Sequence, residues 1–403
     1  MRKRIFTVVA LTGAALLAWL AAPALSLRPY LPEVENFERS LPEAKRLPAG
    51  EVSASSGHSR DEAGGGHVAR FITAPVTAPH EFDLVGVADE MRHLEIRVRD
   101  DGGEWSEWVE QSDGTPIYAG GADEAQVRAE FRPTGEFHFV NVSGTAGGFA
   151  ERLLNDARGA INEAVMTLAS LPVAEAIAPK PGFVVRSAWG ADAAGSACVP
   201  QGPPELGEVR AGVIHHTVNA NTYTAAEAPG IVLGICSFHI HANGWNDIGY
   251  NALVDRYGTI YEGRAGGLVK PVVGAQAQGF NAQTTSIASI GEHTSETLTP
   301  AAQAAVVRFL AWRLAKAGLN PVTKKSKLTS AGGSLNKYAS GSVVSLPRVI
   351  GHRDLGLTEC PGTALYDQIA TIRRSVQKRI KKYAKGGCKR KGKRCRRAKR
   401  LAP

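Results

Sequence analysis

Three potential metal ligands at distant positions constrain the fold of this chain more than any other feature. His215 follows an apolar pair in the segment Val-Ile-His-His-Thr, and His352 and Cys360 bracket one later loop. Small structural zinc sites take their ligands from short knuckles, whereas His215 and His352 are 137 positions apart. Only a folded domain brings such residues together. Two imidazoles and one thiolate leave a fourth position for water, which predicts an open zinc site suited to hydrolysis.

The residues around His215 predict a buried strand over residues 212–215. Because strand side chains alternate between faces, we expect His215 and His216 to point in opposite directions, so that only one of them reaches a given metal. Further strands are expected at residues 251–255 and 285–290, and helices at 225–241, 300–317 and 364–383. Strands that alternate with helices indicate an α/β domain.

Several motifs, taken in order, resemble those of type 2 N-acetylmuramoyl-L-alanine amidases and peptidoglycan recognition proteins. The resemblance extends from about Phe183 to Arg379, roughly half of the chain, and implies a mixed central sheet flanked by helices. The motifs that carry it lie at residues 213–217, 244–251, 255–264, 279–281, 351–354 and 358–362.

The resemblance implies a complete catalytic site. His215, His352 and Cys360 match the zinc ligands of the family, and Tyr250 and Thr358 match the residues that complete its site. The implied reaction is hydrolysis of the amide between N-acetylmuramic acid and L-alanine in peptidoglycan, with zinc-bound water attacking the lactyl carbonyl. The two hydroxyl groups are suited to donate hydrogen bonds to the oxyanion. The alternative is a peptidoglycan-binding protein without catalysis, although such relatives commonly lose the Cys.

Some roles stay open at this level. Glu262 and Glu359 are the nearest carboxylates in the motifs, but nothing in the sequence directs either one at the metal as a general base. Gln276 stands where many relatives have His, so its role near the substrate or the ligands is in doubt. Other histidines are expected to be hydrogen-bonded core residues, namely His239, His241 and His293.

Outside the motifs, differences in amino-acid composition divide the chain into six predicted parts. A basic start and an apolar run predict a signal peptide or an uncleaved anchor, and hence a secreted, wall-associated protein that is membrane-anchored if this segment stays. Trp105 and Trp108, in a β-rich region, are suited either to stacking on sugars or to packing. The predicted parts are a signal or anchor (1–24), a linker (25–66), a small all-β sandwich-like domain (67–145), a helical linker (146–182), the zinc amidase domain (183–377) and a basic tail (378–403).

Charge and cysteines complete the expectations. Fourteen Lys or Arg lie between residues 378 and 400, so the tail carries the basicity of the chain and is suited to anionic wall polymers. No nucleic-acid motif is present, and we expect a monomer. With Cys360 as a ligand, four cysteines remain, which suggests two disulfides in an oxidising compartment. Pairs 198–236 and 388–395 are natural, but four cysteines allow three connectivities.

Overall fold

The computed structural model describes residues 34–48, 69–88, 94–100, 102–111, 114–142, 178–193, 195–320 and 322–390. The predicted signal or anchor and most of the helical linker lie outside these ranges. Within them, no helix is both long enough and apolar enough to cross a membrane.

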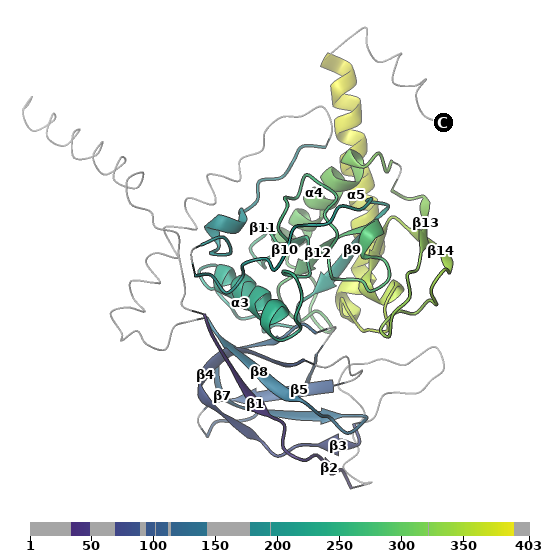
Figure 1. Cartoon of the computed structure of the whole chain (residues 1–403). Coiled ribbons are helices and arrows are strands. Elements are labelled where there is room, and N and C mark those ends of the chain that lie inside the picture. Colours follow the sequence, from purple (N-terminus) through teal and green to yellow (C-terminus); the bar gives the residue numbers. More distant parts are fainter. Residues whose placement is uncertain are drawn as a thin grey trace, which may run out of the picture.

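A five-stranded mixed sheet organises the second half of the chain (Figure 1). Strand β9 (Ala211–His216) is buried along its whole length and runs parallel to both of its neighbours. The antiparallel strand β11 lies at one edge. The spatial order is β11 (Ile260–Glu262), β10 (Ala252–Val254), β12 (Thr284–Ser289), β9 and β15 (Val349–Gly351). The predicted strands are thus confirmed, with ends that differ by one or two residues.

Helices cover both faces of this sheet. The helices α4 (Pro300–Lys316) and α5 (Thr363–Arg390) pack on one face, where Ile214 and Ile287 meet Phe309 and Leu310. Thr299 caps α4 by accepting a hydrogen bond from the Ala302 amide, as N-cap threonines commonly do. The helix α3 (Ala228–His241) packs on the other face. A hairpin of β13 (Lys325–Thr329) and β14 (Val343–Pro347) lies beside the sheet.

An eight-stranded antiparallel β region precedes this α/β domain. All eight strands are hydrogen-bonded into one sheet, rather than into two separate ones. The predicted linker over residues 25–66 is wrong for its middle part, because residues 35–40 pair with residues 136–141 and residues 45–46 pair with residues 71–72. The strands are β1 (Glu35–Ser40), β2 (Lys45–Arg46), β3 (Phe71–Ile72), β4 (Val76–Val87), β5 (Leu94–Arg99), β6 (Val109–Glu110), β7 (Ile117–Ala129) and β8 (Glu136–Asn141).

The two tryptophans of the β region have protein partners. The guanidinium of Arg97 lies over the rings of Trp105 and Trp108, at 4.6 and 4.5 Å, and Arg128 lies 4.6 Å from the Trp108 ring. Cation–π contacts of this kind stabilise both partners. These contacts favour the packing role over sugar stacking.

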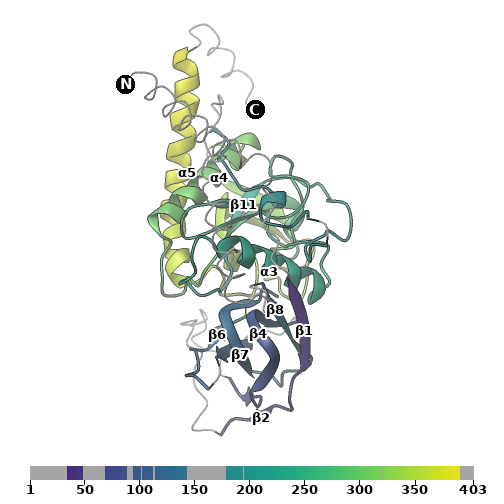
Figure 2. The same cartoon turned by 90° about the vertical axis from the view of Figure 1, so that its left-hand side faces the viewer.

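The β region rests against α3 (Figures 1 and 2). Leu84, Val140 and Val142 share one buried cluster with residues of this helix. The fit is close, because a Cβ atom added at Gly234 would lie 2.4 Å from Leu84, and one at Gly86 would lie 2.5 Å from Phe238. Contacts on both sides explain why α3 is buried from Ala228 to Ile240, since a helix that is apolar all round needs two partners.

The C-terminal helix is longer than the sequence predicts. Residues 378–390, assigned to the basic tail, continue α5. Ile380 is 4% exposed and belongs to the buried cluster that α4 and α5 form with the sheet, and Tyr383 packs against this cluster. The assignment was wrong because the apolar face of the helix persists among many lysines and arginines, which charge counting alone does not register.

Candidate metal centre and catalytic cleft

Strand register places the two predicted histidine ligands side by side. Gly351 of β15 pairs with Ile214 of β9, so the next residue of each parallel strand, His352 and His215, emerges at the same edge. The ring centroids of these two residues are 4.5 Å apart. The following residue, His216, points away from the cluster, and its Nδ1 accepts a hydrogen bond from the His293 amide. This is the alternation that a strand requires.

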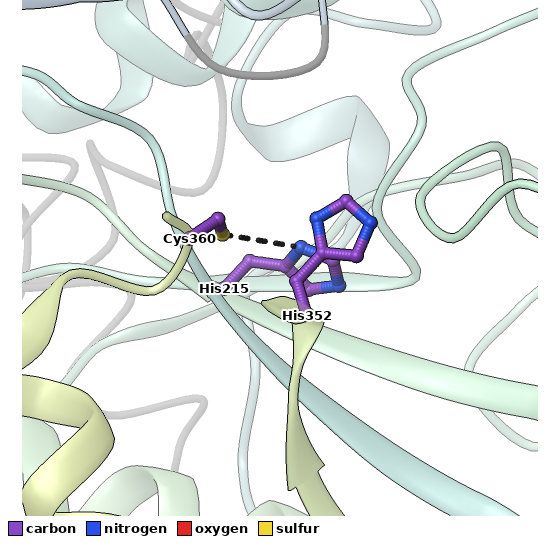
Figure 3. Close-up of side chains that lie close together, drawn as sticks. All are labelled: His215, His352 and Cys360. Atoms are coloured by element: carbon purple, nitrogen blue, oxygen red, sulfur yellow. Dashed lines mark hydrogen bonds between the residues drawn. The ribbon is translucent and has the colours of Figure 1, made fainter. Parts of the chain in front are cut away.

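A turn brings the thiol of Cys360 to the same place. The Arg353 amide donates to the Cys360 carbonyl at 2.8 Å, and the Arg353 side chain pairs with Glu359, which closes the loop that carries both His352 and Cys360. Cys360 Sγ lies 3.6 Å from His215 Nδ1 (Figure 3). One donor atom from each of His215, His352 and Cys360 lies within 4.8 Å of the others, and all three residues are buried.

The donor set fits zinc. Two imidazole nitrogens and a thiolate are ligands that zinc prefers, and a set of three leaves one position for water or substrate. A hydrogen-bond chain also selects the tautomer of His215. Gln276 Nε2 donates to Thr284 Oγ1, so Gln276 Oε1 faces His215 Nε2 as an acceptor at 2.6 Å. His215 Nε2 therefore carries the proton, and the lone pair of Nδ1 faces Cys360.

Tyr250 and Thr358 occupy different surroundings. Tyr250 is 5% exposed, its ring centroid lies 5.3 Å from that of His215, and its hydroxyl is 2.8 Å from Thr115 Oγ1 of the β region. Thr358 Oγ1 accepts a hydrogen bond from the Cys360 amide at 3.1 Å. This bond holds the turn of the thiol ligand.

The remaining histidines are held by other groups. His239 Nδ1 accepts from the Gly249 amide, and burial lowers the pKa of His239 to about 3. His293 bonds to Ser289 and to the Glu296 carbonyl, and burial lowers its pKa to about 4. The expected core position is wrong for His241, which is exposed and whose Nε2 lies 3.2 Å from the Ala197 carbonyl oxygen. None of these three belongs to the metal cluster formed by the described residues.

Neither candidate carboxylate is a metal neighbour in the described cluster. Glu262 belongs to the edge strand β11, and its pKa is raised by burial. Glu359 lines a cavity beside Cys360, but it is ion-paired with Arg353 at 3.2 Å. The geometry therefore does not single out a general base.

Two cavities flank the cluster, and both have walls from the β region as well as from the α/β domain. The first, of about 350 Å³, is bounded by His215, His352, Tyr250, Trp245 and Gln276, and by Ala88, Gly114 and Thr115 of the β region. The second, of about 540 Å³, lies between Cys360 and Trp108. Sequence reasoning missed Ala88, Gly114 and Thr115, because no motif marks them.

A disulfide fixes the entry of the α/β domain. Cys198 and Cys236 are bonded, which confirms one of the open pairings and ties the segment before β9 to α3. Cys395 lies outside the described residues, so the second pairing stays a prediction.

Comparison with known proteins places the chain among relatives. The family model described as N-acetylmuramoyl-L-alanine amidase matches residues 205–363. Peptidoglycan-recognition protein SC2 of Drosophila simulans is 31% identical over 211 residues, which cover 52% of this chain and 96% of that protein. An N-acetylmuramoyl-L-alanine amidase of Sus scrofa is 31% identical over 239 residues, which cover 56% of this chain and 33% of that protein.

Among solved structures, wild-type Drosophila PGRP-LB is 26% identical with a TM-score of 0.36, covering 47% of this chain and 92% of that one. The family model covers His215, His352 and Cys360, and the match to the SC2 protein extends over nearly the whole length of that protein at 31% identity. The chain therefore belongs to the family of type 2 N-acetylmuramoyl-L-alanine amidases and peptidoglycan recognition proteins.

Proposed function

We propose that this protein is a zinc-dependent N-acetylmuramoyl-L-alanine amidase that cleaves peptidoglycan outside the cytoplasm. The observation that carries the proposal is the buried cluster of His215, His352 and Cys360 next to Tyr250 at the wall of a cavity. A structural zinc site is closed by four protein ligands, whereas this cluster supplies three beside open space. Relatives in the family are named for recognition as well as for hydrolysis, and retention of both Cys360 and Tyr250 favours hydrolysis here.

The residues around the cluster suit amide hydrolysis. Bound zinc would lower the pKa of a water molecule to about 7 and polarise the lactyl carbonyl. The Tyr250 phenol would donate a hydrogen bond to the developing oxyanion, and Thr358 is placed on the ligand turn to assist. Because Tyr250 is buried, this hydrogen bond acts at a low local dielectric, where it stabilises charge more strongly than in water.

Metal removal and two substitutions test the proposal. Purified protein should release soluble fragments from dye-labelled sacculi, with mass spectrometry showing free N-terminal L-alanine on the released peptides. Chelation should abolish release, and zinc should restore it. Cys360→Ser should lose metal and activity together. Tyr250→Phe should keep its metal but slow turnover about 100-fold, the size expected for one lost oxyanion donor.

Tyr257→Phe is the matched control, because Tyr257 is exposed and its hydroxyl bonds only to the Tyr223 carbonyl among the contacts described. Wild-type protein that binds sacculi and contains zinc, yet releases nothing, would identify a recognition protein without catalysis. Full activity in metal-free protein, checked by elemental analysis, would exclude the zinc mechanism.

A further inference from the structure

One buried side chain of the β region contacts Tyr250 at the wall of the first cavity. Thr115 lies just before β7 and is 2% exposed. Its hydroxyl is 2.8 Å from the hydroxyl of Tyr250, although the two residues are 135 positions apart. Gly114 accepts a hydrogen bond from Asn243 Nδ2 at 2.7 Å, which anchors the same segment to the end of α3.

The contact is part of a fitted interface. Ser237 of α3 donates to Asn36 Oδ1 of β1 at 2.8 Å, and Leu84 packs against the bare backbone of Gly234. A side chain at Gly234 or Gly86 would collide with the other part of the molecule. A surface that tolerates no added methyl group allows few alternative docking positions. Thr115 is therefore held at a defined position relative to Tyr250.

A buried phenol needs an oriented partner to serve as a hydrogen-bond donor. The 2.8 Å contact between the two hydroxyl groups restrains the direction of the Tyr250 phenol, and the cavity that Tyr250 lines also contains His215 and His352. Thr115 and Gly114 also line that cavity. Displacement of a catalytic group by about 1 Å can cost about 100-fold in rate, so a fixed partner has kinetic consequences.

Building on the proposed amidase function, we propose that the β region is part of the active site, and that Thr115 is a positioning residue which orients the Tyr250 phenol toward the oxyanion. The β region thereby acts in the chemical step and forms one wall of the substrate cleft.

The test removes only the Thr115 hydroxyl. Thr115→Val keeps the shape of the side chain and should lower kcat about 10-fold on a soluble muramoyl peptide, a part of the loss expected when the donor itself is removed. KM and zinc content should stay at the wild-type values. Thr115→Ser should restore kcat. Thr77→Val is the matched control, since it makes the same change at a β-region hydroxyl that bonds to Glu124 far from the cluster.

A double variant separates positioning from general damage. In the Tyr250→Phe background, Thr115→Val should cause no further loss of kcat, because the group it orients is gone. Wild-type kcat in Thr115→Val, or a full additional loss in the double variant, would overturn the inference while leaving the amidase function intact. Should the wild-type protein be inactive, the amidase proposal fails. In that case, the urea midpoints of Thr115→Val, Tyr250→Phe and the double variant decide whether the Thr115–Tyr250 contact exists. Additive shifts of the midpoint would exclude the contact.

Discussion

At the scale of single residues, the metal cluster depends on a neutral acceptor. Gln276 is 6% exposed and joins His215 to Thr284, which in turn donates to the Phe280 carbonyl. An amide cannot titrate, so Gln276 remains an acceptor for His215 Nε2 at any pH. A histidine at position 276 could change its protonation with pH.

Replacement of Gln276 should weaken metal binding. Gln276→Leu leaves His215 Nε2 without this acceptor, and loss of such a partner typically costs 10- to 100-fold in metal affinity, so we expect roughly that decrease. Competition with a zinc chelator measures it. Gln283→Leu is the control, because the Gln283 side chain bonds only to the Thr329 backbone in the described contacts. Equal zinc affinity in both variants would contradict the orienting role.

We expect the free energy of unfolding to decrease in mild acid, because His293 is buried in its neutral form. Burial lowers its folded pKa to about 4, whereas the unfolded value is about 6.5, so the unfolded chain binds the proton more readily. Stability is complete above pH 6.5 and is lost as the pH falls toward 4. Between pH 7 and pH 5 the loss from this residue is about 2 kcal/mol. His239 acts in the same direction.

Urea unfolding at the two pH values measures this effect. His293→Gln lacks the titrating ring and should lose about 2 kcal/mol less than the wild type over the same interval. An identical pH dependence in both proteins would show that other groups cause the acid sensitivity.

At the scale of elements, α5 connects the core to the metal loop. Tyr366 donates to Asp354 Oδ1 at 2.6 Å, and Asp354 also accepts from the Gly351 amide, so the first turns of α5 hold the segment that carries His352. Burial, together with the hydrogen bond to Asp354, raises the pKa of Tyr366 to about 12, which keeps this hydroxyl a donor at any physiological pH.

The later turns of α5 should contribute to stability in spite of their charge. Ile380→Ala removes a side chain that is 4% exposed in the core and should lower the free energy of unfolding by about 2–4 kcal/mol. Lys381→Ala changes the next, exposed position of the same helix and should cost less than about 0.5 kcal/mol. Equal urea midpoints for the two variants would mean that this part of α5 is not docked.

At the scale of the whole molecule, we expect the basic residues at 391–403 to bind partners of opposite charge. Residues 391–403 contain seven Lys or Arg and no acid, and they follow the last described turn of α5. We propose that they bind anionic wall polymers. Their deletion should leave hydrolysis of small soluble muramoyl peptides unchanged and reduce binding to intact walls, most strongly at low salt.

Wall pull-down across a salt series checks this proposal. The full-length protein should lose affinity steeply with salt, and the deletion variant should have a shallower slope because it neutralises fewer anionic groups. Deletion from residue 391 is preferable to deletion from residue 378, which would also remove Ile380 from the core. Identical slopes would show that the end of the chain is not the wall anchor.

The sequence by itself determined the parts of this protein that depend on local pattern. Apolar periodicity located the strands around His215 and the helices α3 and α4, because burial of one face requires that spacing. The motifs around His215, Tyr250 and Cys360 indicated the family and the candidate ligands. Ligands so far apart in sequence can bind one metal only when a particular fold brings them together.

Only the tertiary structure decided what crosses between distant segments. Gln276 and Thr115 acquire their roles from contacts made 61 and 135 positions away. The sequence singled out Gln276 but not its role, and no motif marks Thr115. Strands β1 and β2 were also missed, because they are strands only through pairing with β8 and β3. The last turns of α5 are helical because Ile380 is buried in the core, although many of their residues are charged. The physical reason is that docking depends on shape, and the close approach of Leu84 to Gly234 is visible only when both surfaces are folded.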